Sequence, residues 1–228
     1  MVILQQVLNG LSFGALLFLL ASGFTLVFGL MRIANLAHGA FYLLGGYVGV
    51  VVTATTGNLA AGLVAAAIIV ALLATGVERV LLVRVRGNEL AEVLLTIGVA
   101  FIVADICLAI FGGNPMSLSV SEWLKGSLTF GPMPYPKYRL FIIGFTVLVG
   151  IALYLFQQRS RLGAMIRAGV DDREIAAACG INVDRIMAGV FVLGGVLAGV
   201  AGVIGAGLLS LRPGADVDIL LFAMVVVI

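Results

Sequence analysis

The sequence predicts an all-α protein, a polytopic membrane helix bundle, and three observations support this fold class. Hydrophobic residues make up 62% of the 228 residues, charged residues make up 11%, and the mean hydropathy is +1.23, all typical of integral membrane proteins. Apolar runs of about 20 residues, the length that a helix needs to cross a bilayer, recur along the chain. The alternating pattern of a β-barrel is absent, and helices satisfy their own backbone groups in lipid.

Six apolar runs are long enough to be spanning helices. They cover about residues 4–30, 34–55, 59–83, 90–112, 139–157 and 186–211. A seventh begins near Ile219 and reaches only Ile228, so we expect residues 1–228 to form a single transmembrane domain with an incomplete C-terminus, and the native protein to have about 7–8 spans. The N-terminus lacks the basic region and cleavage site of a signal peptide, so the first run is expected to be a retained span.

The distribution of Lys and Arg indicates which ends of the spans face the cytoplasm. One alternating assignment places nine cations on one side and four on the other: Arg32, Arg79, Arg84, Arg86, Arg159, Arg161, Arg167, Arg173 and Arg185 against Lys125, Lys137, Arg139 and Arg212. The larger group is expected to be cytoplasmic, together with the polar segment 160–185. The N-terminus and the loop 113–138 are then outside, where the loop aromatics Trp123, Tyr135 and Tyr138 suit a membrane interface.

The polar segment from Ser160 to Arg185 is expected to contain one short helix. Asp171 and Glu174 have the spacing of a capping box with Asp171 as N-cap, and Gly180 suits the residue that ends a helix. The helix would have about eight residues, too few to be stable alone in water. It therefore needs a surface, either the cytoplasmic face of the protein itself or a partner.

Three blocks of sequence resemble the permeases of branched-chain amino acid ABC transporters, the LivH-type family. The first, residues 9–47, is N-G-L-S-F-G-A-L-L-F-L-L-A-S-G-F-T-L-V-F-G-L-M-R-I-A-N-L-A-H-G-A-F-Y-L-L-G-G-Y. The second, residues 162–183, is L-G-A-M-I-R-A-G-V-D-D-R-E-I-A-A-A-C-G-I-N-V, and the third, residues 191–203, is F-V-L-G-G-V-L-A-G-V-A-G-V. These matches extend over nearly the whole chain.

The resemblance implies a multi-pass permease subunit of an ABC importer in the prokaryotic plasma (inner) membrane. The short helix would dock in a groove of a cytoplasmic ATPase, with coupling residues Gly163, Arg167, Asp171, Asp172, Glu174, Ile175 and Gly180. The other implied partners are a second permease subunit, an extracytoplasmic solute-binding protein and the lipid bilayer, without nucleic acid. ATP and Mg would be used by the ATPase, and no cofactor is expected in this chain.

The sequence itself supports a separate ATPase. Neither of the two lysines, Lys125 and Lys137, stands in a G-x-x-x-x-G-K phosphate loop, so we expect the chain to be a transporter subunit and not an enzyme. No catalytic residue is indicated, and Cys107 and Cys179 suggest neither a disulfide nor a metal site.

Polar residues within the apolar runs are the candidates for the translocation path. Asn35, His38 and Gly39 open the second run and are expected near the path or its cytoplasmic gate, although a lone histidine also serves as a hydrogen bond between helices. Asp105 lies about 15 residues into the fourth run, either as a proton or ammonium site or as a paired structural carboxylate. Glu78 and Arg79 are expected to extend to the interface.

Other readings of the sequence remain open. A proton-coupled secondary transporter would use Asp105 or His38, but the internal repeat that it predicts is not visible. The substrate could also be urea or a short amide. Three G-x-x-x-G pairs, Gly10/Gly14, Gly45/Gly49 and Gly195/Gly199, are expected to be packing surfaces within the subunit or toward a second one.

Overall fold

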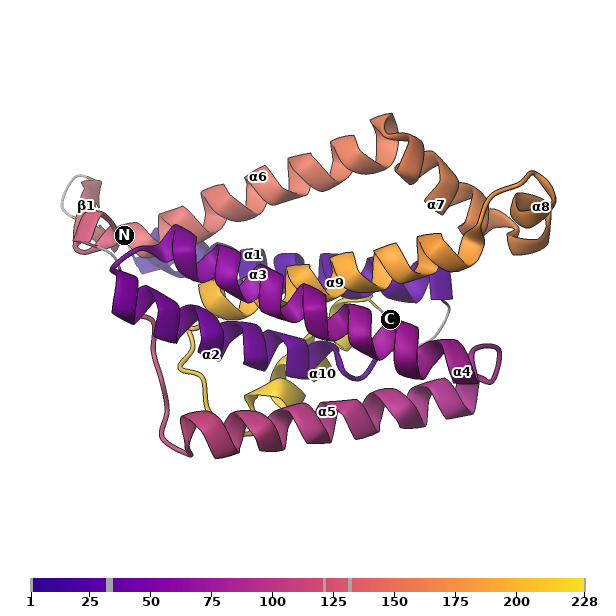
Figure 1. Cartoon of the computed structure of the whole chain (residues 1–228). Helices are drawn as coiled ribbons and strands as arrows, with labels where there is room; N and C mark the ends of the chain where they lie inside the picture. Colours follow the sequence, from indigo (N-terminus) through magenta and orange to yellow (C-terminus); the bar gives the residue numbers. More distant parts are fainter. Residues whose placement is uncertain (1, 32–34, 121, 131–132, 228) are drawn as a thin grey trace.

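The computed structural model describes residues 2–31, 35–120, 122–130 and 133–227, and it is a bundle of long helices (Figure 1). Six helical segments in these ranges are long and apolar enough to cross a membrane. They are α1 (Val2–Met31), α2 (His38–Thr56), the continuous third span of α3 (Leu59–Gly76), η1 (Val77–Leu82) and α4 (Val83–Val85), then α5 (Glu89–Phe111), α6 (Lys137–Arg159) and α9 (Val183–Gly205). The predicted membrane helix bundle is confirmed. Arg32 and Ile228 lie outside the described residues.

Asparagine side chains begin three of these helical segments. The Oδ1 atoms of Asn58, Asn88 and Asn182 accept hydrogen bonds of 2.9–3.1 Å from backbone N–H groups in the first turns of α3, α5 and α9. The first N–H groups of a helix have no partner within the helix, so a side-chain acceptor there fixes where the helix starts. These caps explain why short polar turns separate the apolar runs so sharply.

Helix α9 is the centre of the bundle, and glycines let its neighbours approach its backbone. It contacts α1, α2 and α3 (Figure 1). A Cβ atom added to Gly45 would lie 2.3 Å from the Cα atom of Gly199, so α2 and α9 touch backbone to backbone. The predicted packing role of these two G-x-x-x-G pairs is confirmed, whereas Gly10 and Gly14 face open space in the part of the chain described.

The third span contains a π-helical turn, η1, between α3 and α4. Every fourth residue from Gly62 to Ala74 is buried. Four residues of an α-helix make slightly more than one turn, so the buried face moves around the helix axis by about 40° with each step. A π turn holds one extra residue and so rotates the residues that follow it back by about 100°. Glu78 and Leu82 thereby stay on the buried side, and Arg86 reaches α9.

Helix α2 begins inside the bundle, set back from the ends of α4 and α5 (Figure 1). His38 Nε2 donates to the carbonyl of Leu20 at 3.1 Å, and Leu20 lies eleven residues before the end of α1, about 16 Å along its axis. The backbone N–H of Leu36 donates to Thr96 Oγ1 at 3.3 Å, seven residues or about 10 Å into α5. The second span is thus a shortened helix whose first residue lies at membrane depth.

The polar segment and the long loop lie at opposite ends of the bundle (Figure 1). The polar segment forms two helices, α7 (Arg161–Asp171) and α8 (Arg173–Ala178). The loop forms a short 3₁₀ turn, η2 (Glu122–Leu124), and an antiparallel hairpin of β1 (Ser127–Phe130) and β2 (Met133–Pro136). The opposite placement agrees with the predicted alternation of the spans.

The loop aromatics divide into one exposed ring and two buried ones. Trp123 is exposed and meets Phe141 edge to face with ring centroids 5.7 Å apart. Tyr135 and Tyr138 are buried, and Tyr138 Oη donates to the carbonyl of Ile204 at 2.7 Å. These two tyrosines therefore face the protein interior, Tyr138 at the end of α9, and only Trp123 has the exposure expected of an interface side chain.

The last span ends earlier than its apolar run. Helix α9 stops at Gly205, and residues 206–211 form an irregular, partly buried segment that ends at Leu211, which exchanges two backbone hydrogen bonds of 2.8 Å with Met116. Helix α10 (Ala215–Val227) follows and packs against α1 and α2. The predicted seventh helix near Ile219 is present, and it starts four residues earlier.

Candidate functional site

The start of α2 places polar groups in the interior of the bundle. Asn35 and His38 are both buried, and Asn35 Oδ1 accepts from the N–H of Ala37 at 3.1 Å, which fixes the turn before the helix. Asn35 Nδ2 and His38 Nδ1 have no hydrogen-bond partner among the residues that the structure describes. Buried polar atoms are rarely left unpaired, so these two atoms are candidates for binding a polar group.

Residues of α5 that the sequence did not single out complete this cluster. Asn35, Glu92 and Thr96 line a cavity of about 10 Å³, close to the smallest space that holds one water molecule. Glu92 is buried, and its Oε1 accepts from the N–H of Gly87 at 2.8 Å, which ties the turn between α4 and α5. The available signal was a carboxylate and a hydroxyl four residues apart on one apolar helix.

Gly39 brings the start of α10 against the start of α2. A Cβ atom at Gly39 would lie 2.1 Å from the carbonyl oxygen of Asp216, so only glycine allows this approach. Two helix N-termini, which carry partial positive charge, therefore meet inside the bundle beside the buried carboxylate of Asp216. Half-helices with ends at membrane depth are the usual way in which transporters line a path.

Asp105 is not part of this cluster. It lies on the outward face of α5, beside the exposed side chains of Phe101 and Ile102, and it makes no hydrogen bond or ion pair within the described ranges. The structure therefore brings together Asn35, His38 and Gly39 but leaves Asp105 apart from them. A role for Asp105 in the path stays a prediction.

The N-cap of the short helix is Asp172, so the prediction of Asp171 is wrong by one residue. Asp172 Oδ1 accepts from the N–H groups of Glu174 and Ile175, both at 2.9 Å. Asp171 instead ends the preceding helix α7, which was not predicted from the sequence. Glu174 is then the second helical residue and not the third, so no capping box forms, and α8 has six residues where about eight were expected.

Gly180 ends α8 as predicted. Its φ of +84° is left-handed, its N–H donates to the carbonyl of Ala177 at 2.9 Å, and the N–H of Ile181 donates to Ala176 at 3.1 Å. This pair of bonds is the Schellman motif. A six-residue helix is thus closed at both ends, by Asp172 and by Gly180.

Gly163 and Arg167, also predicted as coupling residues, shape the corner between α6 and α7. A Cβ atom at Gly163 would lie 2.3 Å from the carbonyl oxygen of Gln157, and Arg167 donates to that same carbonyl. Ser160 caps α7 by accepting from the N–H of Gly163 at 2.8 Å. These residues therefore hold the base of the insert, while its tip is α8.

The tip presents an apolar side chain to solvent. Ile175 is 63% exposed on α8, next to the exposed Glu174, whereas Ala176 on the same helix is buried. Single exposed apolar side chains are common on protein surfaces, so a docking role for Ile175 is a matter for experiment.

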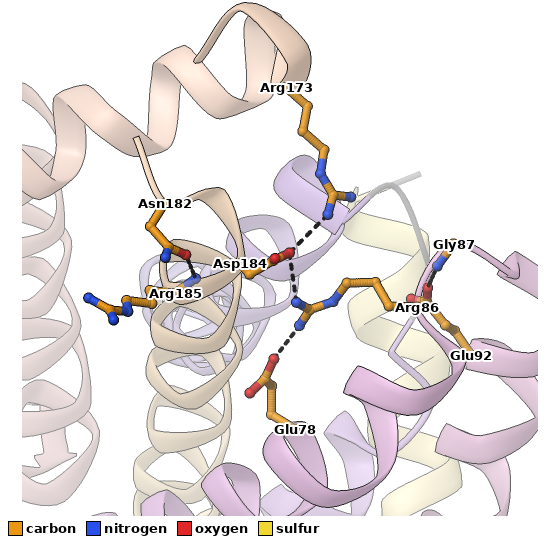
Figure 2. A network of polar contacts seen from close by, with 8 residues as sticks. All are labelled: Glu78, Arg86, Gly87, Glu92, Arg173, Asn182, Asp184 and Arg185. Carbon is orange, nitrogen blue, oxygen red and sulfur yellow. Dashed lines mark hydrogen bonds and ion pairs between the residues drawn. The ribbon is translucent and has the colours of Figure 1, made fainter. Parts of the chain in front are cut away.

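An ion-pair network ties this tip to the spans (Figure 2). Asp184 Oδ1, at the start of α9, accepts from Arg173 of α8 at 3.1 Å and from Arg86 at 2.9 Å. Arg86 also pairs with Glu78 in the π-helical turn of the third span. The chain of contacts thus runs from α8 through α9 to the third span, with Asp184 and Arg86 as its two inner members.

The buried position of Glu78 overturns the expectation that it extends to the interface. Its side chain is only 2% exposed, because the π turn directs it toward α9 and Arg86 neutralises it, whereas Arg79 is exposed. Arg86 is itself only 13% exposed. Burial of a charge inside the protein requires such a partner, and a partner eight residues away along the chain is easily missed in the sequence.

Comparison with known proteins identifies the family. The model of the family described as "branched-chain amino acid transport system / permease component" matches residues 6–228. The chain belongs to this family. The resemblance found in the sequence is thereby confirmed.

Curated relatives agree over most of the chain. It is 33% identical over 214 residues to the high-affinity branched-chain amino acid transport system permease protein LivH of Escherichia coli, a match covering 88% of this chain and 70% of that protein. It is 29% identical over 218 residues to BraD of Pseudomonas aeruginosa, with the same coverage. A probable LivH of Methanocaldococcus jannaschii is 27% identical over 212 residues, 87% of this chain and 65% of that protein.

No solved structure matches the chain significantly. The relatives are named as permease proteins and not as enzymes. With its membrane-length helices, this family member is a multi-pass permease component of the prokaryotic inner membrane.

Proposed function

We propose that this chain is the membrane-spanning permease subunit of an ABC importer, powered by separate cytoplasmic ATPases. Residues 1–228 act as one permease domain, and residues 160–185 are its coupling segment. The observation that carries the proposal is the doubly capped helix α8, which exposes Ile175 and is joined to the central helix α9 through Arg173 and Asp184.

In this proposal, α8 occupies a groove of an ATPase and transmits its movement to the spans. A six-residue helix transmits force only if its ends are fixed, and Asp172 and Gly180 fix them. The displacement passes through Asp184 to α9 and through Arg86 to the third span. Because α9 contacts α1, α2 and α3, a shift of α9 reaches the start of α2.

The solute passes beside the start of α2. Asn35 and His38 offer unpaired polar atoms there, and Gly39 keeps α10 close. A zwitterionic amino acid suits this environment, because the helix N-termini favour its carboxylate and the carboxylate of Asp216 favours its ammonium group. Leucine, isoleucine or valine are the proposed substrates, since the relatives are named for branched-chain amino acids.

The remaining partners follow from the same proposal. A second permease subunit completes the path, and an extracytoplasmic solute-binding protein delivers the substrate. The segment with α7 and α8 then faces the cytoplasm, in agreement with the excess of arginine at that end.

Reconstitution into liposomes with the binding protein and the ATPases tests the proposal. We expect uptake of radiolabelled leucine that depends on ATP and on external binding protein. Ile175→Glu should abolish both co-purification of the ATPase and uptake. The matched control is Leu128→Glu, which changes another exposed apolar residue at the opposite end of the bundle and should leave co-purification intact.

Two outcomes would overturn the proposal. Unchanged ATPase binding and uptake in Ile175→Glu would remove the coupling role of α8. Uptake by the chain alone under a proton gradient, abolished by Asp105→Asn, would indicate a secondary transporter. ATP-driven uptake of urea or a short amide in place of leucine would keep the mechanism and correct the substrate.

A further inference from the structure

The first turns of α9 leave one face uncovered, with a hollow on each side. A hollow of about 410 Å³ lies between α9 and the α6–α7 corner, and one of about 580 Å³ lies between α9 and the third span. Arg185 and Gly189 line both hollows. A Cβ atom at Gly189 would meet no atom within 4 Å, so at this residue only the backbone of α9 forms the ridge that separates the two hollows.

The walls of the two hollows are mainly apolar and extend along the membrane direction. Phe156, Ile166 and Leu193 line the first, and Val83 and Val192 line the second. The second hollow is also lined by Glu78, Asp184 and Arg86, whose charges are paired with one another. Leu193 lies eight residues beyond Arg185, about 12 Å further along α9. Each hollow therefore accepts a slender apolar group that runs from the end of the bundle toward its middle.

Two arginines stand at the mouth without acidic partners. Neither Arg79 nor Arg185 forms a side-chain ion pair or hydrogen bond with any part of the chain that the structure describes, whereas Arg86 and Arg173 are paired. In Figure 2 the side chain of Arg185 points away from Asp184 and Arg86. The N-terminus of α9 adds partial positive charge at the same place.

We propose that these two hollows bind one anionic phospholipid, with its acyl chains on either side of Gly189 and its phosphate between Arg79 and Arg185. The ligand must be apolar along its length, divided in two, and negative at the end nearest the polar segment. A diacyl lipid with an acidic headgroup has all three properties, and basic pockets between spans are its usual sites. This inference does not depend on which solute the chain transports.

The test measures lipids retained by the purified full chain. The chain is reconstituted in nanodiscs that contain equal amounts of phosphatidylglycerol and phosphatidylcholine, then extracted in mild detergent and analysed by native mass spectrometry. We expect one phosphatidylglycerol to be retained in preference to phosphatidylcholine. Arg79→Gln and Arg185→Gln should each lower its retention about fivefold, the equivalent of about 1 kcal/mol per cation near an anionic lipid.

Gly189→Leu is the second variant, because its side chain would fill the ridge that separates the hollows. It should abolish retention, while Gly144→Leu should not, since Gly144 has equally open surroundings on α6 but lines neither hollow. Arg84→Gln controls for loss of charge, because Arg84 is exposed at the same end without lining a hollow. Thermal unfolding in phosphatidylcholine alone should be similar for all five variants, which separates lipid binding from folding.

Three results would overturn the proposal. One is equal retention by Gly189→Leu and Gly144→Leu. Another is an equal loss in Arg84→Gln and Arg185→Gln, which would indicate general surface charge. The third is a Gly189→Cys variant that cross-links in membranes to a polypeptide, which would identify a protein helix as the occupant.

Discussion

Two clusters of polar side chains in this permease differ in how completely they are paired. At the α8 end, Glu78, Arg86 and Asp184 form a continuous series of ion pairs. At the start of α2, Asn35 and His38 are buried to a similar depth as Glu78, and each retains a polar atom without a partner among the described residues; Arg86 Nε also has none, but both terminal nitrogens of Arg86 are paired. Paired polar groups hold helices together, whereas unpaired ones can still bind a further polar group. The difference separates a mechanical linkage from a candidate path, and five substitutions test it.

The largest expected effect follows from removing the central cation of the network. Arg86→Met would leave the carboxylate of Glu78 buried without a partner, and we expect a loss of about 3–5 kcal/mol in the free energy of unfolding. Denaturant titration in mixed micelles measures it. The double variant Glu78→Gln with Arg86→Met should recover most of the loss. A double variant as unstable as the single one would mean that packing, and not charge, causes the effect.

The contact between α2 and α10 comes next. Gly39→Ala places a Cβ atom against the carbonyl of Asp216, and such overpacking should cost about 1–3 kcal/mol and displace α10. Gly144→Ala is the matched control: its Cβ is unobstructed, and the change should stabilise α6 by up to about 1 kcal/mol. Equal stability of the two variants would refute the close approach.

The end of α8 should matter for coupling more than for folding. Gly180→Ala puts an L-residue at a φ of +84°, which costs about 1–2 kcal/mol and loosens a six-residue helix. We expect ATP-driven uptake to fall sharply while the thermal midpoint of the spans changes little. Cys179→Ala, at the neighbouring exposed residue, should leave uptake unchanged. Normal uptake by Gly180→Ala would show that the shape of α8 is unimportant.

At the start of α2 we expect a small effect on stability and a large effect on transport. Asn35→Leu keeps a similar side-chain volume. The lost hydrogen bond to Ala37 destabilises the fold and the removal of an unpaired buried amide stabilises it, so we expect the free energy of unfolding to change by less than about 1 kcal/mol. Transport should nevertheless fall, because the polar atom offered to the path is gone. Leucine uptake and unfolding are measured on the same preparation. If stability falls as far as in Arg86→Met, Asn35 is a structural residue.

The smallest effect belongs to the exposed end of the network. Arg173 and Asp184 are 51% and 66% exposed, so solvent screens their interaction. Arg173→Gln should cost about 0.2–1 kcal/mol, and less at high salt. A double-mutant cycle with Asp184→Asn gives the pair energy. A value that does not change with salt would mean that the pair is shielded by another contact.

Most of the fold could be predicted from composition and run length, because a span must be apolar for about 20 residues. The depth of α2 could not, since an apolar run has no marker for where its helix starts. The end of α9 was missed for a related reason: Leu211 is apolar because it is buried, although it is not helical. In both cases the apolar residues indicate burial and do not indicate where a helix begins or ends.

The sequence predicted those features of the candidate site that depend only on neighbouring residues. Gly180 was correct because its left-handed backbone depends only on neighbouring residues. Asp172 was missed because two caps compete at Asp171 and Asp172, and the preceding helix decides between them. Glu92 and Thr96 stand four residues apart on one apolar helix, but their position beside Asn35 depends on how distant helices align. The pairing of Glu78 with Arg86 depends on the π turn, which the sequence pattern does not reveal.

The π-helical turn also sets how the length of this span can vary. Because η1 holds one residue more than an α-helix needs, deletion of Val80 would close the turn and leave both flanks facing their present neighbours. The same deletion between Gly62 and Ala74 would turn Glu78 and Arg86 by about 100°, away from Asp184. Val77–Leu82 is therefore a place where the third span can lose a residue without losing the linkage.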